Sequence, residues 1–270
     1  MLTLMTTLDA DAPLLIAIQE TGLVSRIVRN REEQAALHGA TVLLVNWPYI
    51  LDEGFIARQS VVVNVHNSLL PRYRGRHAFT WAVMEGEQEL GFSLHKVVAA
   101  VDAGDVLAQA SFRLQPDEDI NDAFRYGEEL LVAWLPRTLK EWTEGRLQAR
   151  PQDELKATMY RRRRPEDNWL GSFGDAEQVR NFVRAVAPPY TPGAMCCTQA
   201  GEILHIASAR LATDVRVADA APGSVLDVTG DAVSVACSSG AVWLVPVESS
   251  MLDSFHAGDL LLATAEGLGG

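Results

Sequence analysis

The sequence predicts an α/β domain built on a parallel sheet, followed by a small β-barrel. In the first 46 residues, short apolar runs alternate with helical segments, which is the order of a parallel sheet covered by helices on both faces. From residue 193 onward the apolar runs are short and are separated by Gly and Asp, as in small barrels. The 270 residues suffice for one sizeable domain and one smaller domain.

The first elements follow from start and stop signals. A strand is expected at residues 2–5, and a helix then runs from Pro13 to a stop at Gly22. The following strands are expected at 23–28 and 41–46, with a short helix at 31–38 between them. Neither a GxGxxG motif after the first strand nor a P-loop occurs, which disfavours a dinucleotide-binding or nucleotide-hydrolysing function.

Residues 61–75 read VVVNVHNSLLPRYRG and form the best candidate for a functional segment. An apolar strand alternates into Asn64 and His66, and the run then ends in a loop with Ser, Pro and Gly. Successive strand residues face opposite sides, so Asn64 and His66 share a face. An amide can donate to a developing oxyanion and an imidazole can move a proton, so the pair suits chemistry at a carbonyl. The alternative is that both are turn residues satisfied by backbone groups.

Residues 91–109 read GFSLHKVVAAVDAGDVLAQ and supply a second candidate segment. A strand is expected at about 92–98, followed by a loop that carries Asp102 and Asp105 around Gly104. In a parallel sheet ligands bind beyond the carboxyl ends of the strands. If the two strands are neighbours, Asp102 reaches His66 at that edge.

Together the two segments resemble the folate-dependent formyltransferase family, which includes methionyl-tRNA, glycinamide-ribonucleotide and amino-sugar formyltransferases. The family's signature is Asn-x-His followed by Ser-Leu-Leu-Pro, an aromatic residue, a basic residue and Gly, and further along Asp-x-Gly. The matching residues are Asn64, His66, Ser68, Leu69, Leu70, Pro71, Tyr73, Arg74, Gly75, Asp102 and Gly104. The resemblance implies a Rossmann-like formyltransferase domain at residues 1–150, a linker with one helix at 151–192, and a small C-terminal β-barrel of the oligonucleotide-binding (OB) type at 193–270.

The resemblance also implies an enzyme that transfers a formyl group from 10-formyltetrahydrofolate, or a related tetrahydrofolate one-carbon donor, to a primary amine. Asn64 and His66 would stabilise the oxyanion of the tetrahedral intermediate, and Asp102 would orient His66 and accept the amine proton. The residues expected to hold the cofactor are Trp47, Tyr49, Ile50, Leu51, Ser68, Leu70, Val98, Val101 and Gly104. The residues expected to meet the acceptor are Tyr73, Arg74 and Arg76.

Helical spacing predicts further packing elements at 77–85 and 119–145, and another helix is expected at 175–186. The run YRRRRPEDNW at 160–169 and the run PPYTPGA at 188–194 resemble the bridge to the C-terminal domain in these formyltransferases, most closely in those that act on nucleotide-linked amino sugars. The family's usual Pro-Tyr-Pro-Gly-Ala is interrupted here by Thr191. The four arginines of the first run are read as a solvated feature of the linker.

Charge decides against a nucleic-acid partner. The formal net charge is -12, and residues 201–270 carry two basic and nine acidic side chains. The favoured acceptor is therefore a small-molecule amine, above all an amino sugar, nucleotide-linked or in a natural product. The alternatives are methionyl-tRNA as acceptor, transfer of a formimidoyl group, hydrolysis of 10-formyltetrahydrofolate, and folate binding without catalysis.

Other classes of site and location find little support in the sequence. The cysteines, Cys196, Cys197 and Cys237, match no disulfide framework or zinc spacing, and the six histidines show no metal motif. A metal site built from His66, His77, His95 and Asp102 is the weaker alternative to none. No apolar run could span a membrane and no signal core opens the chain, so a cytoplasmic protein is expected. The sequence decides neither the acceptor's identity nor whether the chain forms a homodimer.

Overall fold

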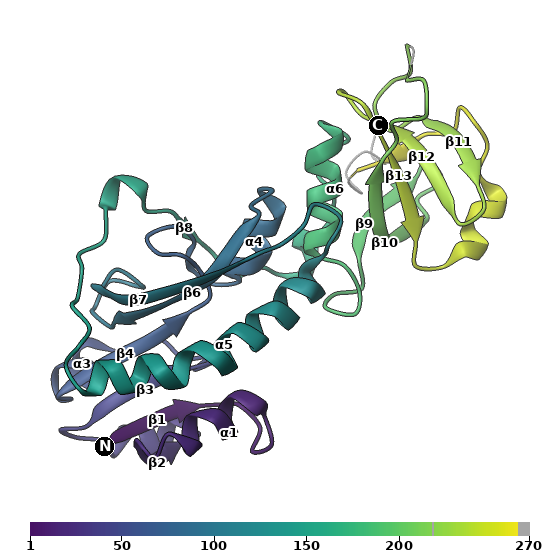
Figure 1. Cartoon of the computed structure of the whole chain (residues 1–270). Coiled ribbons are helices and arrows are strands. Elements are labelled where there is room, and N and C mark those ends of the chain that lie inside the picture. Colours follow the sequence, from purple (N-terminus) through teal and green to yellow (C-terminus); the bar gives the residue numbers. More distant parts are fainter. Residues whose placement is uncertain (218, 264–270) are drawn as a thin grey trace. The chain divides into compact units, whose positions relative to one another are not determined.

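The computed structural model describes residues 1–217 and 219–263. The chain divides into two compact units (Figure 1). The N-terminal unit comprises Met1–Ala78, Glu89–Arg113 and Phe124–Arg162, and the C-terminal unit comprises Phe79–Gln88, Leu114–Ala123 and Arg163–Gly270. The last seven residues of the predicted barrel, 264–270, lie outside the described residues, as does Ala218.

The N-terminal unit is built on a six-stranded sheet of order β2-β1-β3-β4-β6-β7. Its strands are β1 (Leu2–Thr6), β2 (Val24–Val28), β3 (Thr41–Val45), β4 (Val61–His66), β6 (Glu89–Lys96) and β7 (Val106–Arg113). The first four are parallel, as predicted, whereas β6 runs antiparallel to β4, and β7 runs antiparallel to β6. The predicted parallel α/β sheet is therefore present, with two antiparallel strands added at one edge. The side-chain pattern did not reveal them, because it does not tell in which direction a strand runs.

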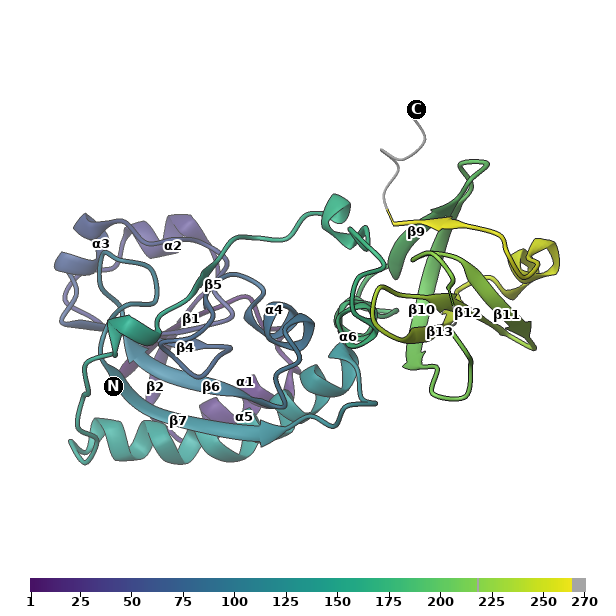
Figure 2. The same cartoon turned by 90° about the horizontal axis from the view of Figure 1, so that it is seen from above.

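Helices cover both faces of this sheet, as the alternation of elements predicts. They are α1 (Pro13–Glu20), α2 (Arg31–Ala35), α3 (Glu53–Ala57) and, reaching into this unit with residues 124–143, α5 (Ile120–Thr143). Figure 2 shows α2 and α3 on one face and α1 and α5 on the other. Asn30 and Asp52 cap α2 and α3 by accepting from backbone N–H groups of the first turn. The helix α3 was not anticipated, and α2 ends three residues before the predicted position.

The face under α3 carries a core that leads to the candidate site. Met5, Leu44 and Val62 contribute to it from three neighbouring strands, and Phe55 contributes from α3. Because alternate residues of a strand share a face, Asn64 and His66 continue the row that begins at Val62. The two polar side chains therefore stand at the end of an apolar layer.

The C-terminal unit is a curled antiparallel sheet of order β11-β12-β13-β10-β9-β14. Its strands are β9 (Ala194–Thr198), β10 (Ile203–Leu211), β11 (Val225–Thr229), β12 (Ala232–Ala236), β13 (Ala241–Pro246) and β14 (Leu261–Leu262). A bridge from Ser224 to Leu260 joins its two edges, so the sheet forms a partly closed barrel. Gly223, at φ +92°, makes this closure possible because a Cβ there would lie 2.4 Å from the Leu261 carbonyl oxygen. The predicted small barrel is confirmed.

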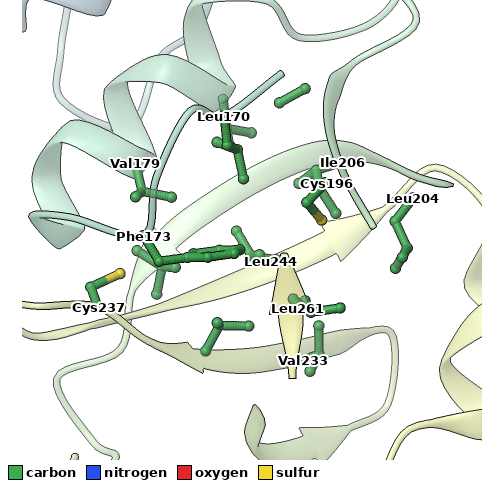
Figure 3. Close-up of a cluster of buried hydrophobic side chains, with 14 of the residues drawn as sticks. Leu170, Phe173, Val179, Cys196, Leu204, Ile206, Val233, Cys237, Leu244 and Leu261 are labelled. Atoms are coloured by element: carbon green, nitrogen blue, oxygen red, sulfur yellow. The ribbon is translucent and has the colours of Figure 1, made fainter. Parts of the chain in front are cut away.

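The helix α6 (Ala176–Ala185) covers the interior of this barrel. Asp175 caps it by accepting from the N–H groups of Glu177 and Gln178, as expected of a helix that begins at this position. Val179 packs with Phe173 and with apolar residues of the sheet, as Figure 3 shows. All three cysteines are free and buried, and Cys196 and Cys237 belong to this core. The remaining elements of this unit are α4 (Ala78–Met84, whose first residue belongs to the other unit), η2 (Pro165–Asn168) and η3 (Ser249–Ser254).

The segment after α5 belongs to the N-terminal unit up to Arg162. It contains the short helix η1 (Glu154–Lys156) and the strand β8 (Met159–Tyr160), which pairs in parallel with β5 (Arg74–Gly75). Tyr73 donates its backbone N–H to the Thr158 hydroxyl at 2.8 Å and stacks on Tyr160. The first part of the stretch expected as a linker therefore packs beside the loop of the Asn-x-His segment.

Candidate active site

Two neighbouring strands place four polar side chains on one face of the sheet. Asn64 on β4 lies directly opposite His95 on β6, and His66 lies opposite Ser93. Directly opposed residues of an antiparallel pair point to the same face. His66, Ser93 and His95 are buried and Asn64 is partly buried, so the cluster lies at the end of the apolar core.

Asp102 completes the cluster from the loop between β6 and β7. Its carboxylate lies 3.6 Å from Nδ1 of His66 and 3.6 Å from Nε2 of His95, and it accepts the backbone N–H of Gly75 at 2.9 Å. Because β6 runs antiparallel to β4, this loop leaves β6 at the end of the strand that points away from His66. The loop must therefore fold back over the sheet to reach His66. Asp102 therefore lies near His66, as expected. The chain reaches this position by a different route from the one that two parallel strands would give.

The ring of His66 is oriented by a backbone group. Its Nε2 lies 2.7 Å from the carbonyl oxygen of Tyr73, and a carbonyl only accepts, so Nε2 carries a proton. The nitrogen that gains or loses a proton is then Nδ1, which faces Asp102. The pair can hold a proton that arrives from a reacting amine.

Sequence reasoning considered His95 only as a metal ligand and missed it as a partner of Asn64 in this cluster. Burial is the main cause that lowers its pKa to about 4, so the ring is neutral at neutral pH. Its Nδ1 lies 2.8 Å from the Lys96 carbonyl and donates to it, which leaves Nε2 as an acceptor for the Asn64 amide N–H at 3.2 Å. The signal was present in the sequence, because Ser93-x-His95 repeats the alternation of Asn64-x-His66 in the adjacent strand.

The loop after β4 is held by hydroxyl groups rather than by apolar packing alone. Ser93 donates to the carbonyl of Ser68 at 2.6 Å and accepts the backbone N–H of Leu70 at 3.0 Å. Ser68 in turn donates to the carbonyl of Arg72 at 2.7 Å. Ser68 and Leu70, both predicted to contact the cofactor, are buried and determine the shape of the loop.

The other residues predicted to hold the cofactor lie on two loops, residues 46–52 after β3 and residues 97–105 after β6. Trp47 and Leu51 of the first loop and Val97 of the second border the same apolar core. On these loops four apolar side chains are exposed to at least 39%: Tyr49, Ile50, Val98 and Val101. The strand predicted at 92–98 ends at Lys96, because the apolar run that follows it belongs to this exposed loop.

Among these predicted cofactor residues, Trp47 has an unpaired polar group and Gly104 has no room for a side chain. The indole N–H of Trp47 is buried and has no acceptor among the described residues. Gly104 lies so close to the chain that a Cβ there would be 2.0 Å from the Lys96 carbonyl oxygen. The glycine of Asp-x-Gly is therefore required by the fold of the loop, whatever it contributes to binding.

The three residues predicted to meet the acceptor are engaged within the protein. Arg74 is buried, and its guanidinium donates to the side chains of Gln152 and Glu154. This hydrogen bond from Arg74 is the main cause that lowers the pKa of Glu154. Arg76 donates to the Pro48 carbonyl, and Tyr73 is buried. Contact of these three with an acceptor stays a prediction.

The part of the chain that the structure describes contains neither a metal-binding group of side chains nor a membrane-spanning helix. No group of three or more His, Cys, Asp or Glu side chains there could hold a metal ion. Within the same residues, no helix combines the length and the apolar character needed to cross a bilayer.

Comparison with solved structures gives matches over most of the chain at low sequence identity. The chain has a TM-score of 0.67 and 12% identity to an N-formyltransferase from Helicobacter canadensis in complex with folinic acid and dTDP-3-aminofucose, over 91% of this chain and 98% of that one. It matches HypX from Aquifex aeolicus in complex with tetrahydrofolic acid at TM-score 0.63 and 20% identity, over 99% of this chain. Another match is a methionyl-tRNA formyltransferase from Clostridium thermocellum, with TM-score 0.60 and 18% identity over 79% of this chain and 95% of that one.

These likenesses concern the fold, and the chain spans only 46% of that HypX chain. Family models give the more direct result. The formyl transferase model matches residues 7–139, and the model of the formyl transferase C-terminal domain matches residues 166–261. The first match contains Asn64, His66, His95 and Asp102. The chain belongs to the formyl transferase family.

Proposed function

We propose that the protein transfers a formyl group from 10-formyltetrahydrofolate to a primary amine of a small molecule, with an amino sugar as the favoured acceptor. The observation that carries the proposal is the cluster in which Asp102 lies 3.6 Å from His66 while Asn64 shares the face of the same strand. An amide donor, an imidazole and a carboxylate are the groups that acyl transfer to an amine needs.

In the proposed reaction the neutral amine attacks the formyl carbon and a new C–N bond forms. The electron pair of the carbonyl bond moves to oxygen, where the free N–H of Asn64 and the imidazolium of His66 stabilise the negative charge. Asp102 accepts the amine proton, directly or through a water molecule. The carbonyl then re-forms, the bond to the donor nitrogen breaks, and that nitrogen takes up the proton. The products are the N-formyl amine and tetrahydrofolate.

The exposed apolar side chains of residues 46–52 and 97–105 support a binding place for a flat, largely apolar ring system beside this cluster. The unpaired N–H of Trp47 would be satisfied by an acceptor on that ring system. A tetrahydrofolate derivative offers both features. Solved relatives that contain folinic acid and tetrahydrofolic acid are consistent with this choice of donor.

Two observations support an amino-sugar acceptor: the negative charge of the chain and the extent of its match to a solved relative. The relative that contains dTDP-3-aminofucose matches this chain over almost the whole length of both. Methionyl-tRNA is the second candidate, because a methionyl-tRNA formyltransferase also matches. The net charge of -12, with nine acidic and two basic residues in 201–270, disfavours a polyanionic acceptor.

The test is incubation with 10-formyltetrahydrofolate and a panel of amines, followed by mass spectrometry. The panel contains nucleotide-linked amino sugars, free amino sugars, aminoglycosides, amino-acid derivatives and methionyl-tRNA. A small amine that gains one formyl group with the wild-type protein, but not with Asn64→Ala, supports the proposal. The variant Ser111→Ala, which removes only an exposed hydrogen bond to Glu89, serves as the matched control.

The other outcomes identify the competing functions. Formylated methionyl-tRNA as the only product would replace the amino-sugar acceptor by tRNA. Accumulation of tetrahydrofolate without any formylated amine would contradict transfer and indicate hydrolysis. If neither product forms with 10-formyltetrahydrofolate but 5-formiminotetrahydrofolate reacts, the transferred unit is formimidoyl.

A further inference from the structure

The side chain of Gln152, in the segment that follows α5, connects this segment to the candidate active site. Its Nε2 donates to the backbone carbonyls of Asp102 and Gly104, both at 2.7 Å. Its Oε1 accepts from Nε and from an Nη of Arg74, at 3.1 and 2.8 Å. The nitrogen and the oxygen of this amide are therefore both hydrogen-bonded, and all their partners lie in the N-terminal unit.

The orientation of the Gln152 amide is determined by its neighbours. A guanidinium only donates, so the oxygen of the amide must face Arg74 and the nitrogen must face the two carbonyls. Arg74 is held in turn by two hydrogen bonds to the Glu154 carboxylate, at 2.9 and 2.7 Å. A partly buried network in which every member is satisfied holds a single arrangement of its parts.

The loop that Gln152 holds has a backbone conformation that needs support. Asp102 has φ 52°, in the left-handed region that residues with a side chain rarely adopt. Its carboxylate contacts His66 and His95 only because the loop folds back over the sheet. The bonds from Gln152 to the carbonyls on either side of residue 103 fasten the loop at this turn.

We infer that Gln152 is a positioning residue that sets the Asp102 carboxylate against His66, and that Arg74 acts by orienting the Gln152 amide. This inference rests on the role proposed above for Asp102. It also gives Arg74 a function that does not require contact with the acceptor. A displacement of a reacting group by about 1 Å can cost on the order of a hundredfold in rate.

The test makes the same change, Gln to Glu, at two positions. Gln152→Glu keeps the shape and the bond to Arg74, but it removes both donors and places an anionic oxygen against two carbonyls. The control is Gln59→Glu, because Gln59 also lies in the N-terminal unit and its amide donates to a backbone carbonyl, that of Leu37, which is not part of the loop that carries Asp102. Both variants should lose stability, and only Gln152→Glu should lose about ten- to a hundredfold in kcat. The rate is measured as tetrahydrofolate formed with the amine that the panel identifies.

A second substitution separates positioning from a general structural effect. In the background of Asp102→Asn, Gln152→Glu should change kcat by less than about twofold, because residues that act as a unit are not additive. A crystal structure of Gln152→Glu should show the residue-102 carboxylate farther from His66. Equal losses of kcat in both backgrounds, or an unchanged kcat for Gln152→Glu, would overturn the inference alone. Wild-type kcat in Asp102→Asn would instead overturn the role proposed for Asp102 and everything that rests on it.

Discussion

Asn64 donates its side-chain N–H to Nε2 of His95 across the β4–β6 pair, at 3.2 Å. Because His95 uses Nδ1 to donate to the Lys96 carbonyl, the neutral ring has only an acceptor left for Asn64. The amide of Asn64 is therefore held with its nitrogen toward His95. One N–H remains to donate to a substrate oxygen.

Removal of that acceptor should lower the rate through Asn64. We expect His95→Leu to reduce kcat by about ten- to a hundredfold, somewhat less than the loss of an oxyanion donor itself. His95→Gln, whose amide oxygen can take the place of Nε2, should recover part of the loss. Steady-state kinetics of the two variants make the comparison. Equal activity of His95→Leu and wild type would show that Asn64 does not need this contact.

Stability should depend on pH through the same ring. Burial lowers the pKa of His95 from 6.5 to about 4, so the unfolded chain binds the proton first as the pH falls. The contribution of the neutral His95 ring to the free energy of unfolding is fully present above pH 6.5 and is lost as the pH falls to about 4. A shift of this size corresponds to about 3 kcal/mol. Thermal unfolding of wild type and His95→Leu should show a smaller loss in the variant over this range, and parallel curves would contradict the assignment.

Gly104 should tolerate no side chain. A Cβ would lie 2.0 Å from the Lys96 carbonyl oxygen, so Gly104→Ala must displace the backbone that carries Asp102. We expect a loss of about 3 kcal/mol in the free energy of unfolding, at the upper end of overpacking effects. Gly145→Ala is the comparison, because Gly145 has φ +73° but no atom within 4 Å of the added Cβ. Urea titrations should give the larger loss for Gly104→Ala, and equal losses would mean that the close approach to Lys96 costs no more than the positive φ at Gly145.

Trp47→Phe should separate donor binding from catalysis. The substitution keeps an aromatic ring in the core next to Leu51 and removes a buried N–H that has no acceptor among the described residues. We expect KM for 10-formyltetrahydrofolate to rise by about tenfold with kcat nearly unchanged, as for the loss of one hydrogen bond to a ligand. The melting temperature of the free protein should not fall. An unchanged KM would exclude this N–H as a ligand contact.

The sequence alone determined the local features of the site and of the two units. Alternation placed Asn64 and His66 on one face, and the helix expected at residues 175–186 is present as α6. The short strands between glycines predicted the small barrel that the structure contains. These features depend on residues close together along the chain, for which side-chain period and backbone preference are sufficient.

The tertiary structure decided what depends on the direction of strands and on distant segments. The antiparallel course of β6 brings His95 opposite Asn64, and the loop that folds back brings Asp102 to both histidines. Gln152, fifty residues beyond Asp102, reads as a linker residue in the sequence and yet holds the Asp102 loop. No periodic pattern encodes such contacts, because the pairing of strands and the return of a segment are settled by packing of the whole unit.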